Sequence, residues 1–323
     1  MDSKTAIWEM NRLGKTGIPF LFIIDFKMNS PQIIPLEKVN PGSILYKVNE
    51  LKNYSDTSVV SKRLEFEKQP IGFNKYKAAF DIVEQNITEG NTYLLNLTFP
   101  TKIETNYTLS EIFHVSKAKY KLYFQNQFVV FSPETFITIK DGNIFSHPMK
   151  GTIDADIENA EQIILNDEKE KAEHITIVDL IRNDLSIVAR DVKVDKFRYV
   201  EEIKTHDKKL LQVSSQISGR LPEKFNESLG EIIFNLLPAG SISGAPKKKT
   251  LEIIEKAENY GRGYYTGIFG VYDGRDLESA VMIRFIENID NNLYFKSGGG
   301  VTFMSNPEQE YQELIDKVYV PIF

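Results

Sequence analysis

A single lysine in a short segment between strand-like runs has the clearest capacity for covalent chemistry. Lys150 lies in the run SHPMKGT, residues 146–152. A lysine amine attacks carbon only when it is neutral, which requires desolvation or a nearby positive charge to lower its pKa. A lysine before Gly-Thr is usually a solvated loop charge, so the segment by itself favours that interpretation, and only the other segments of the chain favour a role in chemistry. Lys150 is therefore a candidate nucleophile.

Two pairs of glutamates have the spacing that places both members on one helix face. Glu170 and Glu173 stand three residues apart, as do Glu310 and Glu313. Like charges at this spacing repel each other unless solvent or a cation relieves them. Solvation is sufficient for one pair, but two converging pairs favour Mg²⁺, which prefers oxygen ligands and takes few from the protein.

Two cations further along the chain are candidate ligands for an anion. Lys317 follows Glu313 by four residues, where it forms either an ordinary helix pair or a contact to a carboxylate held near the metal. Arg284 lies in the apolar run AVMIRFIE, which predicts a strand. An unpaired guanidinium there is costly, and a planar carboxylate is a suitable partner.

Two glycine-containing segments can bring backbone close to a ligand. The run GSISGAPK, residues 240–247, precedes a predicted helix, and a helix start presents unpaired N–H groups to anions. Its spacing does not match a Walker A loop. The three glycines at 298–300 permit close approach of the main chain.

The periodicity of apolar residues predicts an α+β protein with large sheets covered by helices. Residues 1–71 read as strands and turns. Helices are predicted over 74–90, 167–189, 229–237, 246–259 and 307–320, and strands over 18–26, 92–99, 121–131, 134–139, 142–148, 264–273, 277–287 and 292–299.

Composition excludes several classes of function. The chain of 323 residues has no cysteine, which rules out disulfides and thiolate metal sites. A net charge of -6 argues against a nucleic-acid partner. No apolar run reaches the roughly 18 residues that a membrane helix needs, and the start lacks a signal-peptide layout, so we expect a cytoplasmic protein without a membrane contact.

The four segments around Lys150, Gly244, Gly299 and Glu313, in this order, resemble the chorismate-utilising enzymes. Among these enzymes, the resemblance is strongest to component I of aminodeoxychorismate synthase. It implies an α/β sandwich of two layered antiparallel sheets with outer helices. Residues 72–323 would form the chorismate-binding catalytic domain, and residues 1–71 a shortened amino-terminal segment packed on the core.

The same resemblance implies roles for individual residues. Glu173 and Glu313 would be the direct Mg²⁺ ligands, with Glu170 and Glu310 close by or acting through water. Glu134, in the run FSPE, would be the general acid, which requires burial to raise its pKa. The substrate-binding residues implied are Arg284, Tyr265 and Lys317, which would hold a carboxylate, and Ser243, Gly244, Gly299 and Gly300, which would line the chorismate pocket.

Within the resemblance to this family, a lysine at position 150 is similar to the aminodeoxychorismate synthases and implies their reaction. Its amine would attack ring C2 of chorismate as the C4 hydroxyl leaves with help from Glu134, and ammonia would then enter at C4 and expel the lysine. The product is 4-amino-4-deoxychorismate, and a separate glutamine amidotransferase would supply the ammonia. The alternatives are anthranilate synthase component I, whose members carry alanine at this position, and a catalytically silent chorismate-binding subunit.

Two positions depart from the family pattern. Gln212 stands where a histidine is usual, so a polar contact near the ring is either made by Gln212 or lost. Leu94 stands where isochorismate and salicylate synthases carry a water-activating lysine, and leucine cannot act as a base.

Overall fold

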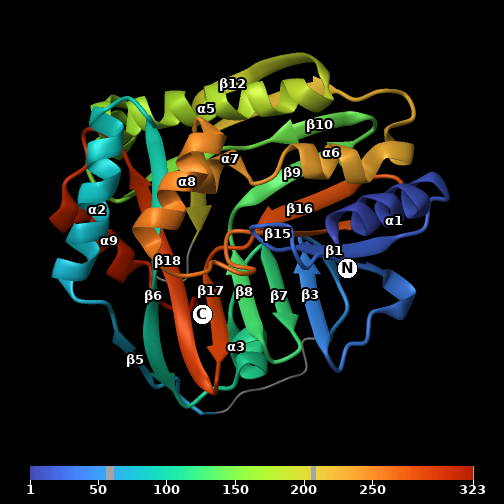
Figure 1. The fold of residues 1–323 in the computed structure, drawn as a ribbon, viewed down its shortest axis with the longest axis horizontal. Coiled ribbons are helices and arrows are strands. Elements are labelled where there is room, and N and C mark those ends of the chain that lie inside the picture. Colours follow the sequence, from blue (N-terminus) through green and yellow to red (C-terminus); the bar gives the residue numbers. More distant parts are fainter. Residues whose placement is uncertain (56–61, 205–208, 323) are drawn as a thin grey trace.

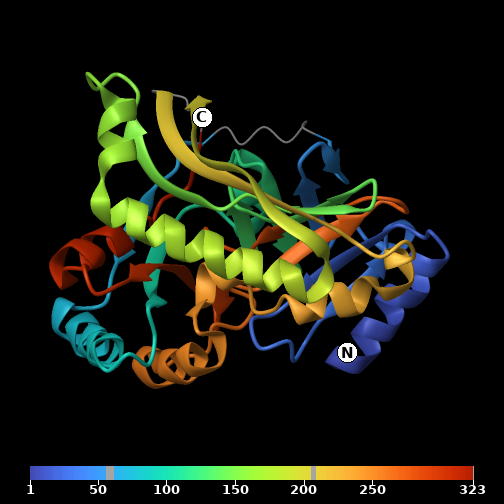
Figure 2. The ribbon, with the colours of Figure 1, turned by 90° about the horizontal axis from the view of Figure 1, so that it is seen from above.

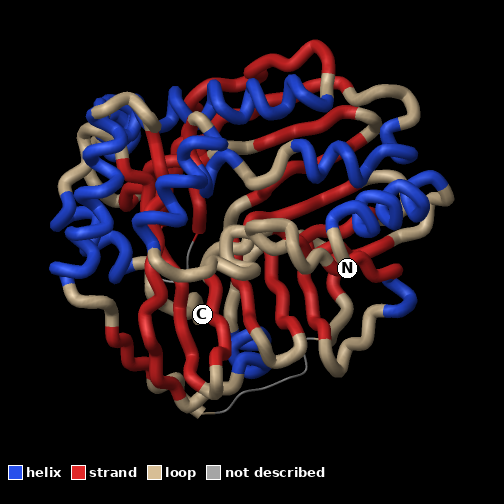
Figure 3. The backbone as a smooth tube through the Cα atoms, in the orientation of Figure 1, coloured by secondary structure: helices blue, strands red, loops and turns tan. Residues whose placement is uncertain are grey.

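The chain forms two antiparallel sheets surrounded by helices. The computed structural model describes residues 1–55, 62–204 and 209–322, and within them each sheet has nine strands. In Figure 1 the strands of the first sheet run across the view and those of the second run down it, while Figure 3 shows the helices at the periphery. The predicted α+β sandwich of two layered sheets is confirmed.

Both sheets combine strands from distant parts of the chain. The first runs in the order β11 (Met149–Asp154), β13 (Lys209–Arg220), β10 (Asn143–Ser146), β9 (Thr135–Lys140), β16 (Leu277–Val281), β15 (Ile268–Tyr272), β1 (Phe20–Ile24) and β2 (Gln32–Pro35), with β12 (Arg190–Lys204) also on β13. The second runs β14 (Gly244–Ala245), β6 (Leu94–Thr105), β18 (Asn292–Val301), β17 (Phe285–Ile289), β8 (Phe128–Ser132), β7 (Tyr120–Phe124), β3 (Ile44–Val48) and β4 (Leu51–Lys52), with β5 (Phe66–Gln69) on β6.

The helices that the apolar periodicity predicts are present. They are α2 (Phe73–Thr88), α5 (Glu168–Val188), α6 (Leu229–Asn235), α8 (Lys247–Glu258) and α9 (Pro307–Asp316); three further helices are α3 (Leu109–Val115), α4 (Ala160–Asn166) and α7 (Gly240–Ser243). Capping fixes the start of α5, where the Asp167 side chain accepts from the Glu170 N–H, and of α9, where Asn306 does the same for Gln309. Within the described residues, no helix has the length and apolar character needed to cross a membrane.

The amino-terminal segment differs from the prediction. Residues Ser3–Lys15 form a helix, α1, instead of strands and turns. Its buried face, which includes Ala6, Met10 and Leu13, packs in one cluster with α6. Strands β1 and β2 belong to the first sheet and β3, β4 and β5 to the second. The strands described within residues 1–71 are therefore shared between the two sheets.

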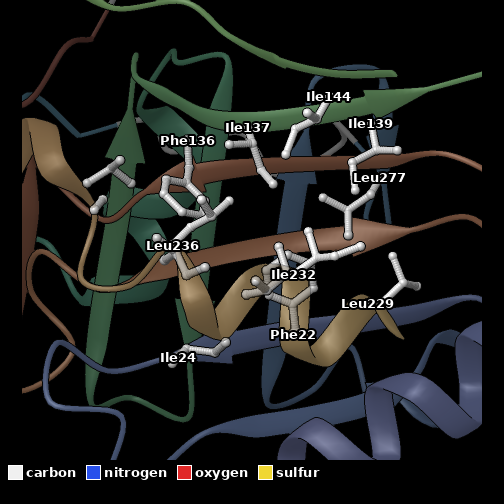
Figure 4. Packing of buried hydrophobic residues seen from close by; sticks show 14 of the residues in the cluster. Phe22, Ile24, Phe136, Ile137, Ile139, Ile144, Leu229, Ile232, Leu236 and Leu277 are labelled. Atoms are coloured by element: carbon white, nitrogen blue, oxygen red, sulfur yellow. The ribbon is translucent and has the colours of Figure 1, made fainter. Parts of the chain in front are cut away.

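Strand β1 shows how the core is layered. Leu21 and Ile23 pack between the two sheets with residues such as Phe269 and Phe285. Phe22 and Ile24 point the other way, toward the helices, because successive side chains in a strand face opposite sides. Figure 4 shows Phe22 and Ile24 in the hydrophobic cluster between the first sheet and the helices. Both faces of β1 are thus covered, which explains its unbroken apolar sequence.

Two of the points at which the chain passes from one sheet to the other are adjacent in space. One lies between β8 and β9, at Glu134, and the other between β16 and β17, at Arg284. The single strand predicted over 277–287 is therefore two strands, one in each sheet. Two backbone hydrogen bonds join the crossing points, from the Val281 N–H to the Glu134 carbonyl and from the Phe131 N–H to the Arg284 carbonyl (both 3.1 Å).

Candidate functional site

A cavity of about 750 Å³ lies where α5, α9, β11 and β18 meet the crossing points. Its volume is in the range of small-molecule sites. Figure 2 shows the start of α5 and helix α9 at one end of the molecule. All but one of the predicted site residues line this cavity: Glu134, Lys150, Glu170, Glu173, Gln212, Gly244, Tyr265, Arg284, Gly299, Gly300, Glu310, Glu313 and Lys317.

Lys150 reaches the cavity from a bulge in β11. The register between β11 and β13 shifts between Lys150 and Thr152, and Gly151 has a positive φ of 68°. The Lys150 Nζ lies 3.1 Å from Glu173 Oε2. Burial alone would lower the pKa of Lys150, but the negative charge of Glu173, with smaller contributions from Glu170 and Glu313, outweighs burial and raises the pKa. The charges of three carboxylates therefore act against the neutral form of the amine that a nucleophile requires.

The two glutamate pairs come from different helices and face the same cavity. Glu170 and Glu173 lie on α5, and Glu310 and Glu313 lie on α9. A Cβ atom at Gly299 would lie 3.3 Å from Glu310 Oε2 and 3.4 Å from Glu313 Oε1. The glycine therefore leaves open a space to which both carboxylates are directed.

Lysines accompany three of these four carboxylates. Besides the Lys150–Glu173 pair, Lys169 Nζ lies 2.8 Å from Glu310 Oε1, and Lys317 Nζ lies 2.5 Å from Glu313 Oε1. In the part of the chain that the structure describes, no three acidic or histidine side chains converge tightly enough to hold a metal. The donors are nonetheless all oxygens, and Glu310 and Glu313 share one opening. This arrangement fits Mg²⁺, which takes one or two protein carboxylates and leaves its other positions to water or substrate.

Glu134 is held by a serine from α7. Ser241 Oγ donates a 2.6 Å hydrogen bond to Glu134 Oε1. Burial raises the pKa of Glu134, and the bond from Ser241 opposes this effect without cancelling it. A carboxyl with a raised pKa remains protonated to higher pH, as a general acid must.

The prediction that Ser243 lines the pocket is wrong. Ser243 is fully buried, and its hydroxyl donates to the Ala239 carbonyl at 2.9 Å. The single turn of α7 points Ser241 into the cavity and Ser243 into the core. The predicted role of Ser243 therefore passes to Ser241, which the sequence argument missed.

Arg284 lies in the bend between β16 and β17, not within a strand, and has a left-handed φ of 51°. Its guanidinium stacks over the Tyr319 ring at 5.5 Å and, among the described residues, has no carboxylate within ion-pair distance. Tyr265 lines the same cavity, and burial raises the pKa of its phenol. Arg284 is thus available to an anionic ligand, whereas Lys317 already has Glu313.

The two positions that depart from the family pattern are both in the cavity wall. Gln212, on β13, pairs with Thr152 of β11 and faces the cavity. Leu94 lies beside the glycine run, since a Cβ at Gly300 would be 3.1 Å from Leu94 Cδ1 and 3.4 Å from Lys150 Nζ. The neighbourhood of Lys150 therefore has an apolar side chain where a second lysine would otherwise stand.

The chain matches the family model described as chorismate binding enzyme over residues 33–322. The chain belongs to this family. It is 51% identical to an uncharacterized PabA-like protein of Haemophilus influenzae over 98% of this chain and 96% of that protein.

More distant relatives have two different names. Anthranilate synthase component 1 of Aquifex aeolicus and aminodeoxychorismate synthase component 1 of Bacillus subtilis are each 30% identical, over 84% and 77% of this chain. The chain spans only 57% and 55% of their lengths. The isochorismate synthase MenF of Escherichia coli has the same fold, with a TM-score of 0.73 at 16% identity over 98% of this chain and 80% of that one.

The protein is therefore a member of the chorismate binding enzyme family. The relatives at equal identity include enzymes of two different reactions, so the finer assignment depends on the side chains of the cavity.

Proposed function

We propose that the protein is component I of aminodeoxychorismate synthase. It converts chorismate and ammonia to 4-amino-4-deoxychorismate and water. The observation that carries the proposal is the Lys150 amine in the wall of the same cavity as Glu134. In having a lysine at this position the chain resembles the aminodeoxychorismate synthases, whereas anthranilate synthases carry alanine there.

Four residues of the cavity have a part in the proposed reaction. Arg284, with Tyr265, binds a carboxylate of chorismate. Lys150 Nζ attacks ring C2 in its neutral form, after its ammonium proton has been lost to solvent. Glu134 gives its proton to the C4 hydroxyl, which leaves as water. Ammonia then bonds to C4, and the C2–N bond to Lys150 breaks.

Glu173 and Glu313, with Glu170 and Glu310 nearby, are the residues that would hold Mg²⁺. The ion would supply positive charge that offsets these carboxylates and binds a substrate carboxylate.

Absence of cysteine supports a separate source of ammonia. The sequence has none, whereas the usual glutaminase depends on a cysteine nucleophile. The partner in the proposal is therefore a glutamine amidotransferase subunit.

Product identification tests the proposal directly. The protein is incubated with chorismate, Mg²⁺ and an ammonium salt, and the products are separated and weighed by mass spectrometry. 4-Amino-4-deoxychorismate is the expected product. Formation of anthranilate and pyruvate would identify the protein as anthranilate synthase component I instead. Unchanged chorismate would favour a catalytically silent binding subunit.

Arg284→Ala is expected to weaken chorismate binding by about 2–5 kcal/mol, because a buried substrate carboxylate loses its charged partner. Steady-state kinetics at saturating ammonium measure this change as a rise in the KM for chorismate. Arg275→Ala, at an exposed arginine paired with Asp141, is the control. An unchanged KM in Arg284→Ala would place the carboxylate site elsewhere.

Ser241→Ala is expected to raise the pKa of Glu134, because the lost hydrogen bond stabilises the carboxylate form. A lysine amine ordinarily has a much higher pKa than a glutamate carboxyl, and the pKa of Lys150 is raised further. The lower inflection of the kcat/KM profile therefore belongs to Glu134. That inflection should move to higher pH. Ser243→Ala, in the same turn but bonded to Ala239, should leave it in place, and equal profiles for both variants would contradict the role of Ser241.

A further inference from the structure

A second, much smaller cavity lies directly behind the site. Its volume is about 30 Å³, and it is bordered by β9, α5 and the segment that leads into α7. Phe136 and Ile137 of β9 and Leu236, which follows α6, form part of its wall, and Figure 4 shows these three side chains side by side. Within the hydrophobic cluster of the first sheet, this is a void beside the catalytic residues.

The two cavities share one wall. Glu134, Ser241 and Pro148 line both of them. The 2.6 Å hydrogen bond between Ser241 Oγ and Glu134 Oε1 therefore lies in the partition between the large cavity and the small one. A molecule in the small cavity is next to the carboxyl that acts on the substrate.

Size and lining restrict what the small cavity can hold. About 10–15 Å³ is needed for one water molecule, so 30 Å³ accommodates one or two molecules of that size. The wall is mainly apolar, with Ser146 as a hydroxyl that donates to the Phe136 carbonyl and retains lone pairs to accept an N–H. Asp184, also in the lining, is paired with Lys247 at 2.8 Å. A neutral molecule suits this lining better than ammonium, whose desolvation is costly.

We infer that this small cavity holds the ammonia molecule that attacks C4 of the substrate. The inference rests on the proposed function. Glu134 gives its proton to the C4 hydroxyl, so its carboxylate is next to C4 when ammonia arrives. The nitrogen lone pair forms the C4–N bond, and the electrons of the C2–N bond return to Lys150 as it leaves. The extra proton on the new C4 ammonium passes to the Glu134 carboxylate, which restores the acid.

Filling the cavity tests the inference. Ile137→Phe enlarges a side chain in the wall of the small cavity, and Ile137 does not line the large one. The KM for ammonia, measured with an ammonium salt at saturating chorismate, should rise roughly tenfold or more, while the KM for chorismate stays near the wild-type value. Ile139→Phe is the matched control, because Ile139 is equally buried on the same strand but lines neither cavity.

A second variant protects the test against misfolding. Ser146→Val also places a larger side chain in the small cavity, and Ser146 does not line the large one. Thermal unfolding followed by circular dichroism verifies that each variant is folded. A folded, active variant with an unchanged KM for ammonia would overturn the inference and leave the proposed function standing. A wild-type protein that makes no 4-amino-4-deoxychorismate from ammonium would overturn both.

Discussion

Lys150→Arg is expected to stop the formation of 4-amino-4-deoxychorismate, with a loss of roughly 10³-fold or more, on the scale seen when a covalent nucleophile is removed. A guanidinium stays protonated at any usable pH and cannot attack carbon. It retains the positive charge that Glu173, only 5% exposed, requires. Single-turnover assays with product detection by mass measure the loss.

Arginine is a sharper test than alanine at this position. Lys150→Ala would leave Glu173 buried without its partner, and breaking a buried pair costs about 3–5 kcal/mol. Lys169→Ala is the control for that effect, since it breaks a pair of the same kind with Glu310, which is 2% exposed. We expect it to destabilise the protein but to retain measurable turnover. Wild-type turnover in Lys150→Arg would exclude the covalent role.

Glu173→Gln and Glu313→Gln are each expected to raise the Mg²⁺ concentration needed for half-maximal activity by roughly 10–100-fold or more. Glutamine has nearly the same shape but supplies a neutral oxygen, so a site with few protein ligands loses much of its attraction. Isothermal titration calorimetry with Mg²⁺ measures binding without turnover.

Glu287→Gln is the matched control for the metal variants. It changes a carboxylate that is paired with Lys296 at 2.6 Å and does not line the cavity. Its Mg²⁺ requirement should equal that of the wild type. A wild-type Mg²⁺ requirement in both Glu173→Gln and Glu313→Gln would show that these glutamates do not bind the metal.

Periodic apolar residues made much of the fold predictable from the sequence. Helices α2, α5, α8 and α9 have buried faces at helical spacing, and the ends predicted for them agree with the observed ends to within a few residues. The division of residues 277–287 into two strands was not predictable, because both halves are apolar. Only the neighbouring strands show that Arg284 stands between two sheets.

Candidate site residues that belong to a sequence motif could be predicted from the sequence. Residues that reach the site only through the local backbone geometry or through a partner distant in sequence could not. The glutamate pairs and Lys150 line one cavity, but their roles stay predictions. Ser241 and Ser243 are the same residue type two positions apart, and only the turn of α7 distinguishes them. Lys169 resembled any exposed helix lysine, since its partner Glu310 is distant in sequence.

The place of β1 in the first sheet bears on how the chain is synthesised. Phe20 pairs with Tyr272 and Ile24 with Ile268, so this wholly apolar strand pairs with a segment that is translated much later. At about 5–20 residues per second, the ribosome needs roughly ten to fifty seconds to make the intervening chain. During that interval the nascent Phe20–Ile24 segment lacks its β15 neighbour, and we expect it to be a principal binding site for chaperones.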